Sequence, residues 1–79
     1  MEEAAQFKET FIIVGKTIRQ KREEQSMSIQ ELAYGLGMSK DRLESIEDGK
    51  YLDITVGDLI LISQKLNVHL KDILVDRYS

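Results

Sequence analysis

The sequence contains no cysteine and no proline, and it has one histidine among its 79 residues. Without cysteine, the chain can form neither a disulfide nor a cysteine-based zinc site. The single histidine, His69, also excludes a metal site built from several histidines. The fold must therefore be stabilised by packed apolar faces, and the hydrophobic content of 42% is sufficient for one small domain.

A long apolar run is also absent from the sequence. No stretch approaches the roughly 20 apolar residues that span a membrane. The first residues, Met1-Glu2-Glu3, are acidic and lack the basic and apolar regions of a signal peptide. We therefore expect a soluble, cytoplasmic protein with no membrane partner, and the absence of cysteine agrees with a reducing compartment.

An excess of positive charge is missing too, because the formal net charge is −3. Contacts between basic residues and phosphates supply most of the non-specific affinity of nucleic-acid-binding proteins. The net charge therefore does not indicate such a partner. The basic residues are nevertheless clustered, since residues 15–22 contain two lysines, two arginines and no acidic residue.

The sequence does contain apolar residues at helical spacing. In the first segment they recur at steps of three and four, which places them on one face of a helix: Ala4, Phe7, Phe11, Val14 and Ile18. We expect helices from residue 2 or 9 to 25, over 28–36 and 39–48, from 55 to a stop at Asn67, and over 70–75. The fold class is therefore all-α. Residues 1–10 form an N-terminal extension that continues the first helix, 11–75 the domain and 76–79 a C-terminal tail.

Polar residues before the apolar runs predict where the helices begin. A capping box needs a hydroxyl residue and an acidic residue three positions later, as in Ser28 with Glu31 and Thr55 with Asp58. Gly37 is expected in a left-handed conformation, where it ends the second helix and allows a tight turn. The expected N-terminal caps are Ser28, Ser39, Thr55 and, more weakly, His69.

Two helices of about nine residues joined across a glycine are typical of a helix-turn-helix. Further residues at characteristic positions extend this pattern over most of the chain: Gly15, Ile18, Arg19, Arg22, Ser28, Leu32, Ala33, Gly37, Met38, Ser39, Leu43, Ile46, Glu47, Gly49, Leu59 and the ending 66–74. With these residues, the segment from about Phe11 to Leu74 resembles the phage-repressor (Cro/Xre-like) family of helix-turn-helix domains. The resemblance implies a compact five-helix, lambda-repressor-like DNA-binding domain whose second and third helices form the motif.

The resemblance also implies that the third helix enters the major groove of double-stranded DNA. Lys40, Asp41 and Ser45 would then read the bases, because lysine can donate to guanine, aspartate can accept from cytosine, and serine can do either. The residues expected to contact phosphates are Arg19, Gln30, Ser39, Arg42 and Lys50.

Two further features follow from the comparison with the family. Arg22 and Glu47 stand where the family has an ion pair that ties the first helix to the third. Ile29 stands where many members have a glutamine that contacts DNA, so that Gln30 or backbone amides must replace that contact. Because residues 39–50 carry three basic and four acidic side chains, we expect weak binding that depends strongly on DNA sequence.

The sequence contains no catalytic arrangement, since the hydroxyl residues are explained as caps and no base accompanies them. We expect no enzyme, no cofactor, no metal and no small-molecule ligand. The predicted function is a transcriptional regulator that binds DNA as a homodimer, formed through the N-terminal extension or the last helix. The alternative is a protein-interaction module of the antirepressor or antitoxin type, with an eroded DNA surface. The loop residues Tyr51 and Leu52 are expected to pack on the core or to touch the partner subunit.

Overall fold

The computed structural model describes residues 2–50 and 54–74, and for residues 2–9 only the backbone. In chain order the helices are α1 (Glu2–Glu24), α2 (Ile29–Leu36), α3 (Lys40–Glu47), α4 (Val56–Lys65) and α5 (Leu70–Ile73). The expected all-α architecture is confirmed. The last helix is shorter than predicted and ends at Ile73. The predictions for the side chains of Ala4 and Phe7, for Tyr51 and Leu52, and for the tail 76–79 lie outside what the structure describes.

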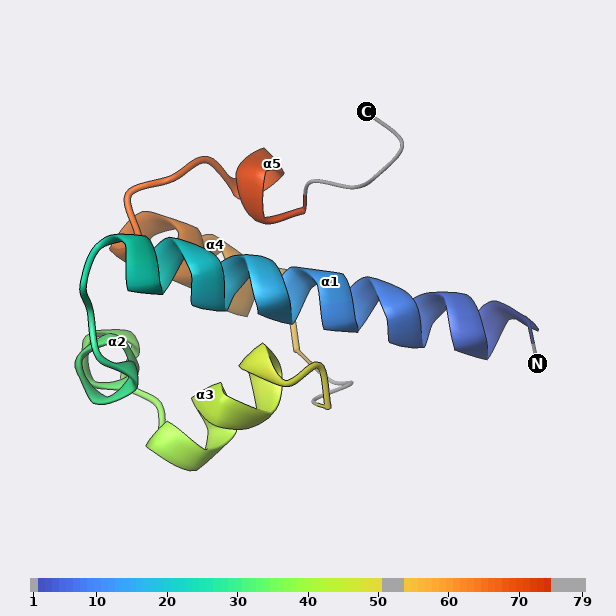
Figure 1. Ribbon diagram of the computed structural model, residues 1–79, viewed down its shortest axis with the longest axis horizontal. Helices are drawn as coiled ribbons and strands as arrows, with labels where there is room; N and C mark the ends of the chain where they lie inside the picture. The colour runs from blue at the N-terminus through green and yellow to red at the C-terminus, as the bar shows by residue number, and fades with distance from the viewer. Residues whose placement is uncertain (1, 51–53, 75–79) are drawn as a thin grey trace.

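The helices are arranged around the long helix α1 (Figure 1). On one side α1 packs against α3, and on the other it packs against α5. Helix α2 contacts both α3 and α4, and α4 contacts α5. The N-terminal part of α1 projects beyond the other helices (Figure 1). The helix-turn-helix pair therefore lies together on one side of α1.

The core consists of apolar side chains contributed by every helix. Each fully buried leucine or isoleucine of this kind stabilises the fold by about 1.5–3 kcal/mol. The buried apolar residues of the core are Val14, Ile18, Leu32, Ala33, Leu43, Ile46, Ile62, Leu66 and Ile73. Helices α2 and α3 contribute four of these nine residues, and the opposite face of α3 remains free for another role.

Helix α1 crosses the end of α3 at very short range. A Cβ atom at Gly15 would lie 2.6 Å from the backbone oxygen of Glu47. Gly49, just after α3, has a φ of 75° and faces α1, since a Cβ there would lie 2.7 Å from Ile12 Cα. Only glycine fits at either position, so the two backbones are in direct contact and fix the angle of α3.

The helix starts follow the predicted caps. Ser28 Oγ accepts a hydrogen bond from the Glu31 amide at 3.0 Å, and the Ser28 amide donates to Glu31 Oε1 at 2.8 Å. Thr55 and Asp58 form the same reciprocal pair. Ser39 caps α3, whereas His69 makes no side-chain cap hydrogen bond.

The turn between α2 and α3 occupies only three residues. Gly37 is left-handed with a φ of 69°, and its amide donates to the carbonyls of Ala33 and Tyr34. Asn67, the predicted stop of α4, is also left-handed, with a φ of 56°. The turn at Gly37 therefore sets the orientation of α3 relative to α2.

Candidate nucleic-acid interface

Helix α3 has one buried and one open face. Leu43 and Ile46 are fully or almost fully buried against the core. On the other face Lys40 and Asp41 are exposed, and Ser45 is half-buried. The three side chains predicted to read bases therefore lie on or beside the solvent-facing side of α3.

A buried carboxylate anchors the end of α3 to α1. The side chain of Glu47 has no exposed surface, and Arg22 approaches it with Nε at 2.8 Å from Oε2 and Nη2 at 3.0 Å from Oε1. Arg22 Nη1 also donates to the carbonyl of Met27 at 2.8 Å. The hydrogen bonds to Glu47 raise the pKa of Arg22 above its ordinary value. A buried ion pair of this kind fixes geometry more than it adds net stability.

Arg19 joins the same network from one helical turn earlier. Its Nε lies 3.2 Å from Glu47 Oε1, and its Nη2 lies 2.6 Å from Asp48 Oδ1. The hydrogen bond to Asp48, followed by that to Glu47, raises the pKa of Arg19. Arg19 was expected to contact a phosphate, but two carboxylates of the same chain engage its guanidinium group.

Arg42 is also held by a carboxylate. Its Nη2 lies 2.9 Å from Asp58 Oδ2, the oxygen that also accepts the Thr55 amide in the capping box of α4. The contact joins the first turn of α3 to the first turn of α4. A second predicted phosphate contact is therefore engaged within the domain.

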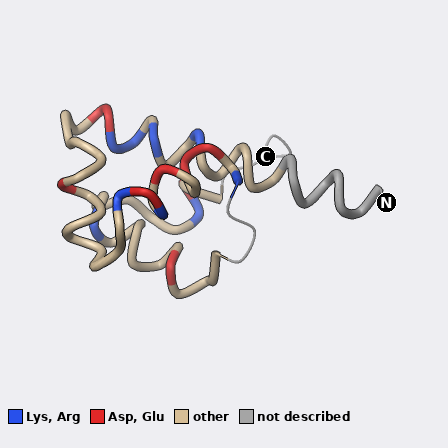
Figure 2. The backbone as a smooth tube through the Cα atoms, turned by 90° about the horizontal axis from the view of Figure 1, so that it is seen from below, with Lys and Arg blue, Asp and Glu red and all other residues tan. Residues whose placement is uncertain are grey.

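The remaining charges on this side are of both signs. Lys40 and Lys50 are exposed, as are Asp41 and Glu44, and within the described part of the chain none of the four forms an ion pair. Basic and acidic positions lie side by side in the first turn of α3, and its later charged positions are acidic (Figure 2). Because the arginines are paired with Glu47, Asp48 and Asp58, the candidate interface is close to electrically neutral.

The first turn of α2 and the cap of α3 each offer an uncharged polar side chain to solvent. Gln30 is exposed, so its amide can reach a phosphate. Ser39 Oγ accepts the Arg42 amide at 3.1 Å, which leaves the hydroxyl hydrogen free to donate. Ile29, the departure from the family pattern, is partly buried and packs against the core. Its apolar side chain is explained by packing.

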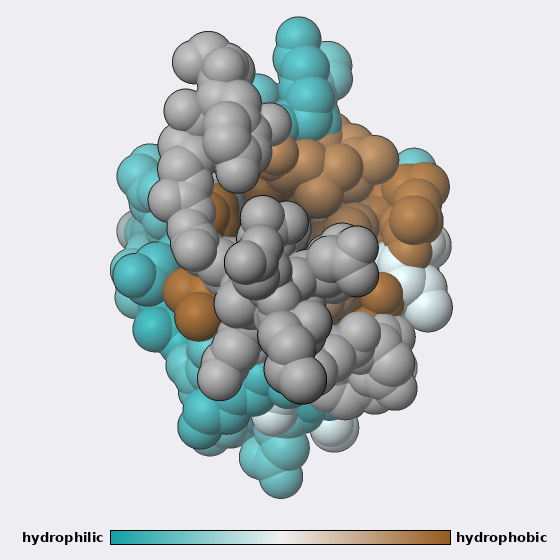
Figure 3. All heavy atoms as spheres, turned by 90° about the vertical axis from the view of Figure 1, so that its right-hand side faces the viewer, coloured by the Kyte–Doolittle hydropathy of each residue, from teal (hydrophilic) through white to brown (hydrophobic). Residues whose placement is uncertain are grey.

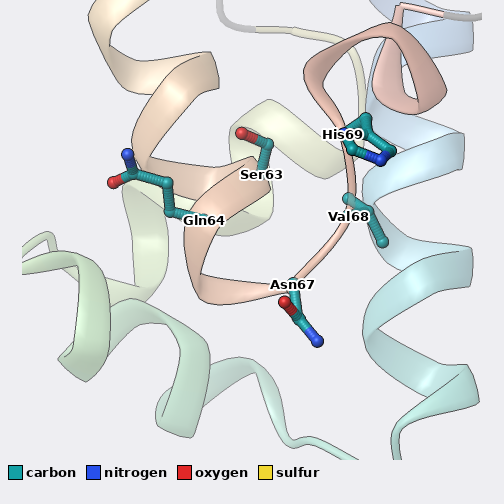
Figure 4. Close-up of a pocket in the computed structure, with 5 residues that line it drawn as sticks. All are labelled: Ser63, Gln64, Asn67, Val68 and His69. Carbon is teal, nitrogen blue, oxygen red and sulfur yellow. The ribbon is translucent and has the colours of Figure 1, made fainter.

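A hollow of about 360 Å³ lies at the junction of α4 and α5. Its lining residues are Ser63, Gln64, Asn67, Val68 and His69. Figure 4 shows their side chains pointing in different directions instead of converging, and the Ser63 hydroxyl donates to the Ile60 carbonyl at 2.7 Å. This hollow therefore offers no constellation for catalysis.

Two other kinds of site are absent from the described residues. They contain no group of three or more histidine, cysteine, aspartate and glutamate side chains that is able to hold a metal ion. Within the same part of the chain, no helix combines the length and the apolarity needed to cross a lipid bilayer.

The sequence matches the family model described as Helix-turn-helix over residues 18–73. This chain belongs to the helix-turn-helix family. The match spans α2, α3, α4 and α5 together with the C-terminal end of α1, and it confirms the resemblance to Cro/Xre-like domains. The helix-turn-helix domain described here is thus a DNA-binding domain of transcriptional regulators, a family that is not enzymatic. No curated protein matches the sequence.

Solved structures of regulators share the fold of this helix-turn-helix domain. SinR, described as the master regulator for biofilm formation, was solved in complex with DNA; it is 33% identical, with a TM-score of 0.72, covering 77% of this chain and 97% of that one. The N-terminal DNA-binding domain of SinR from Bacillus subtilis is 30% identical, with a TM-score of 0.74, covering 85% and 97%. The restriction-modification controller protein C.AhdI from Aeromonas hydrophila is 16% identical, with a TM-score of 0.75, covering 80% and 94%.

Sequence reasoning missed two contacts of the helix-turn-helix domain. The first is Arg19 with Asp48, for which a signal existed: Arg19 stands three residues before Arg22, and Asp48 follows Glu47 directly. Because residues three apart share a helix face, both arginines were placed to meet both acids. The second is Arg42 with Asp58, for which no local signal existed, since the capping box already explained Asp58.

Proposed function

We propose that this helix-turn-helix domain is a sequence-specific transcriptional regulator that places α3 in the major groove of DNA. The observation that carries the proposal is the open face of α3, which presents Lys40, Asp41 and Ser45 while its other face is fixed by the core and by Glu47. Rigid presentation matters because base reading requires hydrogen bonds of defined geometry. The complex of SinR with DNA supports the proposal by similarity.

Phosphate contacts come in this proposal from two groups of residues. Lys50, Gln30 and Ser39 are exposed and available in the free domain. Arg19 and Arg42 reach phosphates only by exchanging or sharing their carboxylate partners. We therefore expect modest affinity for DNA of arbitrary sequence, and a larger contribution from base contacts to the affinity for the correct site.

We also propose that the domain acts as a homodimer, with two copies on two half-sites. Apolar side chains gather on the side from which α1 projects (Figure 3). Three large apolar residues of α4 are exposed, and so is the residue that directly follows α5: Val56, Ile60, Leu61 and Leu74. A second copy seated there would shelter these side chains and double the number of DNA contacts. A regulator of this kind acts where the DNA is, and we propose the cytoplasm as its location.

The experiment that tests this function is selection of binding sites from random duplex DNA. We expect an enriched sequence with two related half-sites, and an affinity that falls as salt concentration rises. If no sequence is enriched and the binding signal is insensitive to salt, the DNA function is wrong. Retention of a protein partner by the apolar face of α4 and α5 would in that case favour the interaction-module alternative.

A further inference from the structure

The ion pair between Arg19 and Asp48 differs from the other pairs that hold α3. Both side chains are 41% exposed, and Nη2 lies 2.6 Å from Oδ1. By contrast, Glu47 has no exposed surface and the Arg22 side chain is only 11% exposed. The Arg19–Asp48 pair is thus accessible to an anion from solution, whereas the Arg22–Glu47 pair is closed to it.

Asp48 occupies the exposed Nη2 donor of Arg19, which that side chain would offer to a phosphate, while Nε of Arg19 faces Glu47. Guanidinium binds carboxylate and phosphate oxygens in the same planar geometry, so the two anions compete for the same hydrogens. The pair also stands at the end of α3, two positions before Lys50, which is exposed. Asp48 therefore adds a negative charge next to the two basic residues best placed to approach the DNA backbone at this end.

We propose that Asp48 lowers the affinity of the domain for DNA by holding Arg19 in an intramolecular ion pair. This inference rests on the proposed DNA-binding function, and it assigns to Asp48 a role opposite to that of Asp41. Asp41 reads a base and so affects which DNA sequence is preferred, whereas Asp48 regulates a contact with the DNA backbone. Its removal changes the affinity for all duplexes alike, because phosphates carry no sequence information directly.

The test compares Asp48→Asn with the matched control Glu44→Gln in the full chain. Both substitutions remove one negative charge from α3 or its end, but only Asp48 contacts Arg19. We expect Asp48→Asn to lower Kd about fivefold at low salt, the scale of one exposed ion pair. We also expect the slope of log K against log salt to steepen by about 0.9, as for one additional phosphate contact. Base preference stays the same, and Glu44→Gln changes the slope little.

A second comparison isolates Arg19. In an Arg19→Gln background, the gain from Asp48→Asn should fall to the level of the Glu44→Gln control. Asp48→Ala, which also removes the acceptor, should give at least the gain of Asp48→Asn. Thermal unfolding checks that each variant is folded, which is expected because the Arg22–Glu47 pair is untouched.

The outcomes separate this inference from the function on which it rests. If the unmodified domain binds DNA but Asp48→Asn leaves Kd and slope unchanged, or if Glu44→Gln gives an equal gain, the role of Asp48 is wrong and the function stands. A gain that persists undiminished in the Arg19→Gln background also overturns it. If neither the unmodified domain nor any variant binds a duplex, the proposed function fails and the role of Asp48 fails with it.

Discussion

Gly15 is required by the close approach of two helices, and its replacement tests that contact directly. A Cβ atom at this position would lie 2.6 Å from the backbone oxygen of Glu47 and 2.9 Å from its carbonyl carbon. Alanine gains up to about 1 kcal/mol over glycine in a helix, but here α1 and α3 must separate to admit it. We expect Gly15→Ala to lower the free energy of unfolding by about 1–3 kcal/mol, as for other overpacked sites. Urea unfolding of both proteins measures this difference in the free energy of unfolding.

Gly35→Ala is the matched control for this prediction. A Cβ atom at Gly35 would meet only the flexible side chain of Lys65, at 3.6 Å. The helix propensity of alanine then acts without a clash, and we expect an unchanged or slightly higher free energy of unfolding, by up to about 1 kcal/mol. Equal effects of the two substitutions would mean that α1 and α3 are not in backbone contact in solution.

Helix α2 begins with a capping box whose strength depends on pH. The hydrogen bond from the Ser28 amide lowers the pKa of the Glu31 carboxyl below its ordinary value of 4.5. Because the pKa is lower in the folded state, the contribution of the carboxylate is complete above the unfolded value. It is lost as the pH falls through the folded value.

We therefore expect Glu31→Gln, which keeps an acceptor but no charge, to be less stable than the original chain at neutral pH. The difference should shrink on acidification below pH 4.5, the ordinary value for this carboxyl. Urea midpoints of both proteins measured across this range provide the test. A difference that stays constant with pH would show that the charge of Glu31 does not stabilise the cap.

Helix α3 presents two exposed lysines with different proposed roles. Lys40 lies on its first turn and Lys50 follows its end. We expect Lys40→Ala to relax preference at one base position, at a cost of about 1–3 kcal/mol for the preferred base. Lys50→Ala should instead weaken binding to every sequence and flatten the salt slope by about 1. Competition binding with single-base variants of the selected site, at several salt concentrations, separates the two. Identical behaviour of the two variants would contradict these roles.

Helix starts were predictable because a cap depends on residues within one turn. Ser28, Ser39 and Thr55 accept the amide three positions later, as the sequence pattern predicts. The pair of Arg22 with Glu47 was implied only by the family resemblance. The contact of Arg42 with Asp58 was not predictable, because it joins residues 16 positions apart and depends on how α4 packs. The end of α5 also differed from the prediction of 70–75, because so short a helix contains too few residues to show a helical periodicity.

For the molecule as a whole, the proposed dimer gives a further prediction. Leu61 is 48% exposed on α4, and a lysine there would place a charge in the proposed interface between two copies. Removing charged groups from water at such an interface is unfavourable. We expect Leu61→Lys to be monomeric at concentrations where the original chain is dimeric, as measured by analytical ultracentrifugation. Its affinity should fall for a duplex with two half-sites and remain similar for a single half-site.

Tyr34→Lys is the control for the dimer prediction. Tyr34 is 90% exposed on α2, which contributes no residue to the proposed interface, so the substitution adds the same charge to another helix. We expect this variant to dimerise as the original chain does. A monomeric original chain at all concentrations, or equal loss of dimer in both variants, would refute the proposed interface.

The pairing of arginines with acidic side chains of the same chain has a consequence for how such a regulator finds its target. A chromosome offers on the order of 10⁶–10⁹ competing sites. A domain with free guanidinium groups on this side would spend most of its time bound to these competing sites. Because Arg19, Arg22 and Arg42 are already neutralised by Glu47, Asp48 and Asp58, wrong sites should release the protein quickly. More molecules are then free at any moment, and each should pass from one site to the next more quickly.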